Sequence, residues 1–161
     1  MGVVVATTLC CPAMAGPRTL APVAIISTDA QHVVGLVEGV MVGEPGAKAV
    51  RLARIVLYSP TQDDVADAAG RYVGKANVSV FQLQVDCGGA RIRAAAADYF
   101  QWPDAARAHH VDYDKALFIP AEEDQTRAIV SAVCAATAGD PGASEPAPDL
   151  AAFVQAAKAR F

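Results

Sequence analysis

Two cysteines constrain this fold more than any other feature, because they lie on predicted elements of different kinds. Cys87 ends an alternating strand pattern, and Cys134 lies on the apolar stripe of a helical segment. The chain has 4 cysteines, and the other two fall within residues 1–15, which resemble a secretion signal. One pair then remains, which predicts an exported domain in which a disulfide joins a helix to a sheet.

The N-terminal segment has the length and composition of a signal peptide. Residues 3–14 are almost entirely apolar and uncharged, too short to cross a bilayer but long enough for the apolar core of a signal. Ala13 and Ala15 supply the small residues that signal peptidase recognises. No lysine or arginine precedes the apolar run, so either the reading frame begins upstream or this stretch is a buried first strand. We expect cleavage after Ala15 and a periplasmic or secreted location.

The chain beyond the signal has the size of one domain. Residues 16–138 are expected to form an α+β domain, residues 139–148 a linker rich in proline and glycine, and residues 149–161 a short amphipathic helix. Asp149 is placed to cap that helix. Because so short a helix is marginal alone in water, we expect it to dock, on its own domain in preference to a partner.

The first half of the domain predicts strands separated by polar connections. Residues 23–27 form a short apolar run, and residues 31–42 favour a glycine-bent strand over an irregular helix because β-branched residues dominate. Residues 49–58 predict a further strand that ends at Pro60. Residues 61–70 are polar and predict a connection with at most one helical turn.

The stretch from residue 78 to residue 100 predicts a β-hairpin. Its first half alternates apolar and polar side chains with period two, and Gly88-Gly89 then supplies a turn. This turn fixes a register in which apolar residues face apolar ones and arginines face an acid or an amide. The predicted pairs are Cys87 with Ala90, Asp86 with Arg91, Val85 with Ile92, Gln84 with Arg93, and Leu83 with Ala94. Arg91 and Arg93 should therefore face solvent, with Ile92 inside.

The remaining segments complete the predicted α+β fold. Residues 101–104 break the strand, residues 105–114 are polar, and residues 117–120 are short and apolar, an edge strand or a lead-in. Residues 121–137 predict a helix, with acidic residues at its N-terminal end. Its apolar stripe carries Thr126, Val130, Val133, Cys134 and Thr137. We therefore expect an antiparallel sheet of about four to six strands, with this helix packed across it and joined to it by the Cys87–Cys134 disulfide.

One pattern in the chain resembles a known family. A strand ends in Asp-Cys, an arginine-rich strand returns, a tyrosine follows, and a second cysteine lies on a later helix. The residues concerned are Val85, Asp86, Cys87, Arg91, Arg93, Tyr99, Val133 and Cys134. This resembles surface-adhesin protein E and similar small exported bacterial proteins, over about residues 33–136. The resemblance implies the sheet, helix and disulfide described above, and an adhesive role. No lipobox is visible, and the terminal helix lies outside the pattern.

Few residues have the types and spacing of a chemical site. His109, His110 and Asp112 are weak candidates for a metal site, because adjacent histidines on an extended chain point in different directions. A solvated loop is the simpler interpretation of this stretch, and no other metal site is predicted. No serine lies in the sequence context of a nucleophile elbow.

Four other residues are candidates for binding. Arg91 and Arg93, together with Arg71, could form a basic strip that holds an anion, although pairing with Asp86 and glutamines is the simpler interpretation. Tyr99 and Trp102 form either a contact patch or part of the core at the strand end.

These observations favour an exported, non-catalytic interaction domain, either adhesin-like or an envelope accessory protein. The alternative is a small periplasmic metal-binding protein or hydrolase that uses His109, His110 and Asp112. The net charge of −4 argues against a nucleic-acid partner, and no later segment has the roughly 20 apolar residues of a membrane-spanning helix. No cofactor is implied. A protein partner is expected in general terms, with no indication of its identity or of the oligomeric state.

Overall fold

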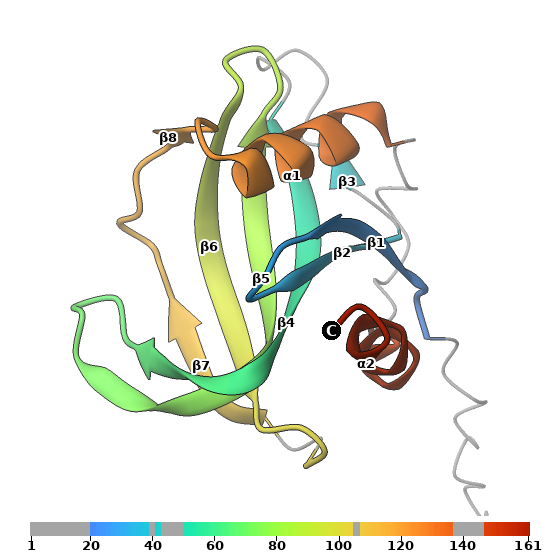
Figure 1. The fold of residues 1–161 in the computed structure, drawn as a ribbon. Coiled ribbons are helices and arrows are strands. Elements are labelled where there is room, and N and C mark those ends of the chain that lie inside the picture. The colour runs from blue at the N-terminus through green and yellow to red at the C-terminus, as the bar shows by residue number, and fades with distance from the viewer. Residues whose placement is uncertain (1–19, 39–40, 43–49, 105–106, 137–146) are drawn as a thin grey trace, which may run out of the picture.

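The computed structural model describes residues 20–38, 41–42, 50–104, 107–136 and 147–161. The described residues form an eight-stranded antiparallel sheet and two helices (Figure 1). The strands are β1 (Val23–Thr28), β2 (Val33–Val37), β3 (Met41–Val42), β4 (Val50–Ala66), β5 (Tyr72–Asp86), β6 (Arg91–Phe100), β7 (Arg107–Asp112) and β8 (Ile119–Pro120). Their order is β1-β2-β4-β5-β6-β7, with β3 paired to β4 and β8 paired to β6.

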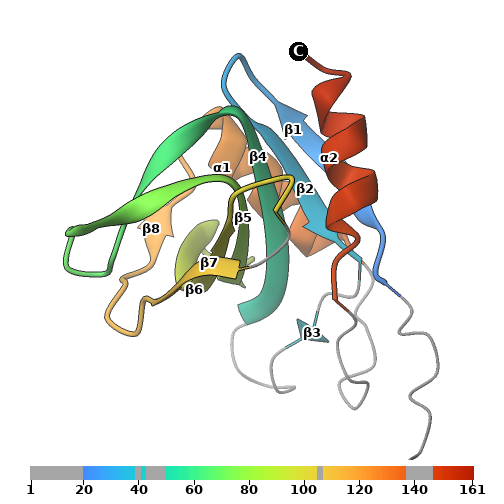
Figure 2. The same ribbon diagram turned by 90° about the horizontal axis from the view of Figure 1, so that it is seen from below.

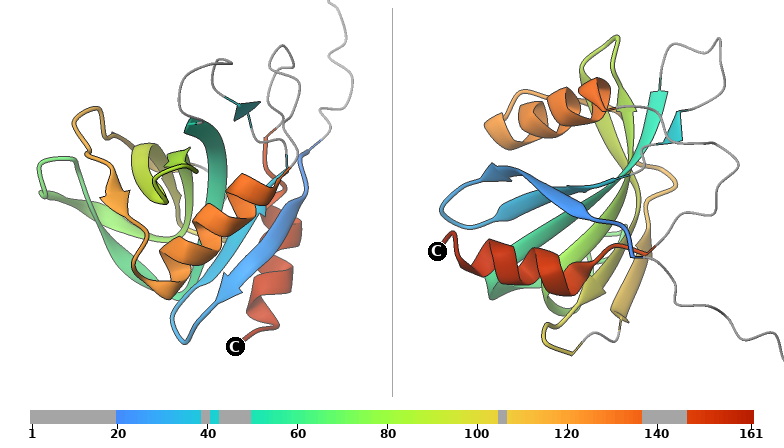
Figure 3. Two further views of the ribbon diagram at one scale, coloured as in Figure 1. Left: turned by 90° about the horizontal axis from the view of Figure 1, so that it is seen from above. Right: turned by 90° about the vertical axis from the view of Figure 1, so that its right-hand side faces the viewer.

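The helices α1 (Asp124–Ala135) and α2 (Leu150–Lys158) pack on opposite faces of this sheet, with the β1–β2 hairpin between them (Figure 3). We name the two faces of the sheet after these helices. Successive residues of a strand point to opposite faces, so a strand buried on both faces carries a continuous apolar run. In β2, for example, Val34 packs on the α1 face and Val33 on the α2 face, and both are fully buried.

Each helix buries its own apolar cluster against the sheet. The cluster on the α1 face contains Val34, Leu36, Ala53, Ile55, Leu83, Val85, Ile92, Ile129, Val130 and Val133. The cluster on the α2 face contains Ala21, Val33, Val37, Val56, Tyr58, Val78, Val80, Phe153, Val154 and Ala157. The expected α+β class is therefore confirmed, and α2 docks on its own domain.

A glycine lets α2 approach the sheet closely. A Cβ atom on Gly35, in the middle of β2, would lie 2.5 Å from Val23 Cγ1 and 2.6 Å from Phe153 Cε2. Real Cβ atoms do not approach other atoms so closely, so any side chain here would force the side chains of Val23 and Phe153 to move. The glycine within the predicted strand is thus a packing requirement.

The predicted hairpin register is confirmed. Asp86 pairs with Arg91, Val85 with Ile92, Gln84 with Arg93, and Leu83 with Ala94. Ile92 is 6% exposed, whereas Arg91 is exposed and Arg93 is half-buried, so both arginines are more accessible than Ile92, as expected. The turn is longer than predicted, because Cys87 and Ala90 belong to it and Ala90 adopts a φ of 48°.

The predicted disulfide is also present. Cys87 and Cys134 are bonded, with their Cα atoms 5.7 Å apart, inside the range of bridged pairs of about 4.4 to 6.8 Å. The bond joins the end of the β5–β6 hairpin to the last turn of α1. A second contact supports the same turn, because Arg51 Nη1 donates hydrogen bonds to the backbone carbonyls of Val133 at 2.7 Å and Ala136 at 2.8 Å.

Three sequence predictions are wrong in detail. β4 does not end at Pro60 but continues to Ala66, because residues 59–62 form a bulge opposite Asn77 that places the proline outside the paired ladder. Residues 107–112 are not a loop but the edge strand β7. This strand pairs with β6, and the local sequence pattern does not indicate that pairing. The predicted strand over residues 31–42 is represented by two short strands among the described residues, β2 and β3.

The remaining predictions concern the two helices and the terminal segments. α1 is shorter than the predicted 121–137, and α2 begins after Asp149, whose carboxylate accepts a hydrogen bond from the Ala152 N–H at 3.0 Å. The predicted signal, and the linker apart from its last two residues, lie outside the described residues. None of the described helices has the length and apolar character needed to cross a membrane.

Candidate functional site

Two of the four candidate binding residues lie together. Arg91 and Arg93 extend from β6 on the α2 face and stack on the ring of Phe118, at 5.7 and 5.1 Å from its centroid. Arg91 Nη2 donates to Asp86 Oδ2 at 2.6 Å, and Arg93 Nε donates to Gln84 Oε1 at 2.8 Å. The hydrogen bond from Arg91 also lowers the pKa of Asp86. Both guanidinium groups are thus held by their neighbours, which matches the simpler interpretation of this strip.

The other candidates lie elsewhere. Tyr99 is 8% exposed on the α1 face, its hydroxyl lies 2.7 Å from that of Tyr113, and burial raises the pKa of Tyr99. Trp102 packs beside the α2-face cluster, and its backbone N–H donates to Asn77 Oδ1 at 2.7 Å. Arg71 lies at the tip of the β4–β5 hairpin, paired with Asp67. The four predicted residues and Arg71 therefore do not form one site.

The two adjacent histidines lie on opposite faces of β7, as the extended chain implies. His109 lies against Gly74 of β5, where an added Cβ would be 2.1 Å from His109 Nε2. His110 lies between two carboxylates, with Nδ1 2.7 Å from Asp98 Oδ1 and Nε2 3.1 Å from Asp112 Oδ1. No group of three or more His, Cys, Asp or Glu side chains within the described part of the chain is placed to hold a metal ion.

The position of His110 favours its protonated form. A neutral imidazole has one N–H donor, whereas both ring nitrogens of His110 face carboxylate oxygens, so only the imidazolium satisfies both contacts. The bond to Asp98, and then the bond to Asp112, raise the pKa of His110. The pair of carboxylates therefore stabilises a positive charge on His110 at the β7 edge.

We expect this charge to be measurable by histidine NMR. The pKa of His110, followed through its ring carbon-bound protons, should lie above the ordinary value of about 6.5, and Asp98→Asn should lower it. Since folding raises the pKa, the contribution to stability is complete below the unfolded pKa and is lost as the pH rises through the folded pKa. Asp114→Asn is the matched control, and a His110 pKa that stays the same in Asp98→Asn would contradict the assignment.

An open cleft of about 510 Å³ lies between the tip of the β4–β5 hairpin and β7. We call it the β7 cleft. Its lining residues are Asp67, Ala68, Ala69, Arg71, Val73, Ala108, His109, His110, Val111 and Asp112. The long hairpin curves strongly away from the rest of the sheet, which brings its tip to β7 (Figures 1 and 2). The cleft brings together the histidine segment and the predicted polar connection of residues 61–70.

Asp67 accepts several hydrogen bonds within the tip of this hairpin. Its Oδ1 accepts hydrogen bonds from the N–H groups of Ala69 and Arg71, both at 2.9 Å, and its Oδ2 accepts the Arg71 guanidinium at 2.8 Å. The backbone bond from Arg71, followed by its side-chain bond, lowers the pKa of Asp67. Below the tip, a small apolar cluster that includes Val65, Val111 and Tyr99 supports the cleft.

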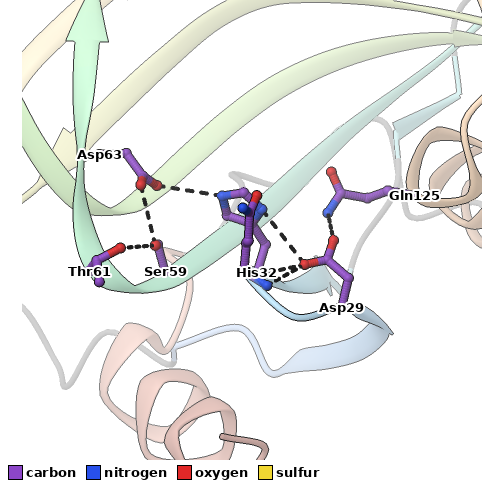
Figure 4. Close-up of polar contacts among 7 residues, drawn as sticks. Asp29, His32, Ser59, Thr61, Asp63 and Gln125 are labelled. Carbon is purple, nitrogen blue, oxygen red and sulfur yellow. Dashed lines mark hydrogen bonds and ion pairs between the residues drawn. The ribbon is translucent and has the colours of Figure 1, made fainter.

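A second polar network joins three elements around the turn between β1 and β2 (Figure 4). Asp29 Oδ1 accepts the N–H groups of Gln31 and His32 at 2.7 Å, and its Oδ2 accepts Gln125 Nε2 of α1 at 3.2 Å. His32 Nε2 lies 3.5 Å from Asp63 Oδ2. The network ties the β1–β2 turn to α1 and to the β4 bulge.

The same network contains a serine, a histidine and aspartates, the residue types of a serine hydrolase, but they are not arranged as a catalytic triad. Ser59 is 2% exposed, and its Oγ contacts Thr61 at 3.3 Å and Asp63 at 3.4 Å, whereas His32 contacts Asp63 and Asp29. Serine and imidazole are thus joined only through a shared carboxylate, which does not place a base on the hydroxyl. The bonds observed here are those of a structural tie.

The features that the sequence does not predict depend on contacts between residues far apart in the chain. Phe118 belongs to a short apolar run, and no local pattern indicates that two arginines of β6 stack on its ring. The spacing of Asp29 before Gln31 and His32 is typical of an Asx turn and could have identified that turn. Comparisons of the chain with protein-family models, with curated proteins and with solved structures found no match. The resemblance to surface-adhesin protein E therefore stays a prediction.

Proposed function

We propose that this chain is an exported, non-catalytic interaction domain whose contact surface is the β7 cleft. The observation that carries the proposal is the cleft itself, which combines the hydrogen-bonded tip of the β4–β5 hairpin with a strand at the edge of the sheet. The side chains that could take part in catalysis instead make contacts that stabilise the fold. His110 bonds to two carboxylates, and Ser59 is buried in a polar network.

Export is the second part of the proposal. The Cys87–Cys134 disulfide fits an oxidising compartment, because thiols in the cytosol are mostly kept reduced. Residues 1–15 supply the expected signal, and mass spectrometry of the mature chain tests cleavage after Ala15. An adhesin-like or envelope accessory role follows from the resemblance to surface-adhesin protein E, and it is the form of binding we propose.

Site-specific photo-crosslinking tests the contact surface. Ala68, an exposed residue of the hairpin tip, is replaced by benzoyl-phenylalanine in the full chain, and the matched control carries the same probe at Ala156 on the exposed side of α2. After irradiation of intact cells, we expect a crosslinked product from position 68 and none from position 156. Equal products from both positions, or none from position 68, would contradict the proposed surface.

A further inference from the structure

The β7 cleft runs along the edge of a strand and not over one face of the sheet. Its β7 wall consists of the consecutive residues 108–112, and these include His109 on the α1 face and His110 on the α2 face. Side chains of both faces can line one hollow only where the hollow follows the strand edge. The backbone of β7 is therefore part of the wall.

This edge offers backbone groups for pairing. β6 is the only strand that pairs with β7 in the described part of the chain, so β7 ends the strand order on this side. In an antiparallel ladder, about half of the N–H and C=O groups of an edge strand point away from its neighbour. None of the backbone hydrogen bonds found outside the ladders of the described chain involves residues 107–112. At the opposite edge, in contrast, both helices contact β1.

From this arrangement we infer that the β7 cleft binds an extended polypeptide segment, which adds to β7 as an antiparallel strand. The inference rests on the proposed function and names its partner chemistry. Addition of a strand to an open sheet edge is an established mode of peptide recognition, in which backbone bonds give affinity and alternate side chains give specificity. β7 is 6 residues long, so a segment of about the same length would match it.

The charges beside the edge specify the added segment. On the α2 face, the carboxylate of Asp112 lies in the β7 wall of the cleft beside His110 and presents a negative charge to an added strand. The Asp112 side chain is 66% exposed, and only its Oδ1 contacts His110. Opposite charges across paired strands are stabilising, so basic side chains suit this face.

The other face of the cleft carries His109 together with the apolar residues Val73 and Val111. Val111 is 5% exposed, and Val73 packs against the same small cluster below the hairpin tip. Side chains that alternate between the two faces of an added strand would therefore be basic on one side and apolar on the other. The partner we infer is a segment with this alternation, such as lysine or arginine alternating with valine.

A designed hexapeptide of alternating lysine and valine, acetylated and amidated at its ends, tests the inference by NMR titration of the isotope-labelled mature protein. We expect the largest amide shifts in residues 107–112 and 71–75, and slower hydrogen exchange in β7. A peptide with glutamate in place of lysine should bind about ten-fold more weakly or worse. Asp112→Asn should weaken binding of the lysine peptide, whereas Asp114→Asn should leave it within about two-fold.

A bulky side chain in the cleft provides an independent test. Ala68→Trp should weaken binding of the lysine peptide by about ten-fold or more, and Ala156→Trp on α2 should not change it. Equal affinity of the Ala68→Trp variant, shifts centred on Arg91 and Arg93, or no saturable shift up to about 5 mM peptide would overturn strand addition. If the peptide fails but crosslinking from position 68 succeeds, the proposed function stands and strand addition is wrong. If both fail, both are wrong.

Discussion

Replacement of Cys87 and Cys134 together by serine should lower the free energy of unfolding by about 4 kcal/mol, the largest loss that we expect from removal of any one bond in the described structure. The two residues are 47 positions apart, so the disulfide closes a long loop in the unfolded chain and restricts its conformations. Serine at both positions avoids a free thiol. Urea unfolding followed by circular dichroism measures the change.

Reduction of the wild-type protein is the matched control for this pair of substitutions. Dithiothreitol should lower the stability of the wild type to that of the double variant and should leave the double variant unchanged. α1 should remain docked in both, because Arg51 still holds its last turn and Ile129, Val130 and Val133 remain buried. A loss below about 1 kcal/mol would show that the bond does not stabilise the fold and that the dithiol needs a redox explanation.

The parts of the fold that could be predicted from the sequence depend on short-range patterns. The β5–β6 register follows from alternation on both sides of Gly88-Gly89, where a slip of one residue would place Ile92 on the wrong face. The disulfide could be predicted because each cysteine lies on a periodic element whose buried face the sequence reveals. α2 could be predicted from its Asp149 cap and its apolar side.

The β7 cleft could not be predicted, because it depends on contacts between distant residues. Pro60 indicates the end of a strand, yet the bulge that accommodates it opposite Asn77 lets β4 continue and gives the hairpin its length. The close approach of His109 to Gly74 then fixes the tip near β7. Taken alone, Pro60 indicates only a turn and His109 only a solvated loop. The sequence therefore indicated which residues could matter here, but not that they lie together around one cleft.

Phe153→Ala should lower the free energy of unfolding by about 3 to 5 kcal/mol, the second large effect we expect. Phe153 is 2% exposed and packs in the α2-face cluster with Val33, Val56 and Val78 of the sheet, so alanine leaves a cavity against the strands. Chemical denaturation measures the loss, and Phe153→Leu should cost less because it keeps most of the volume.

Gln155→Ala, on the exposed side of the same helix, is the control and should change stability by less than about 0.5 kcal/mol. The comparison also decides between the two docking sites that the sequence allowed for this helix, its own domain or a partner. An isolated chain in which Phe153→Ala costs no more than Gln155→Ala would mean that α2 is not docked on its own sheet in solution. In that case the surface formed by Val33, Val56 and Val78 would be open to a partner, and the β7 cleft would lose its standing as the main contact surface.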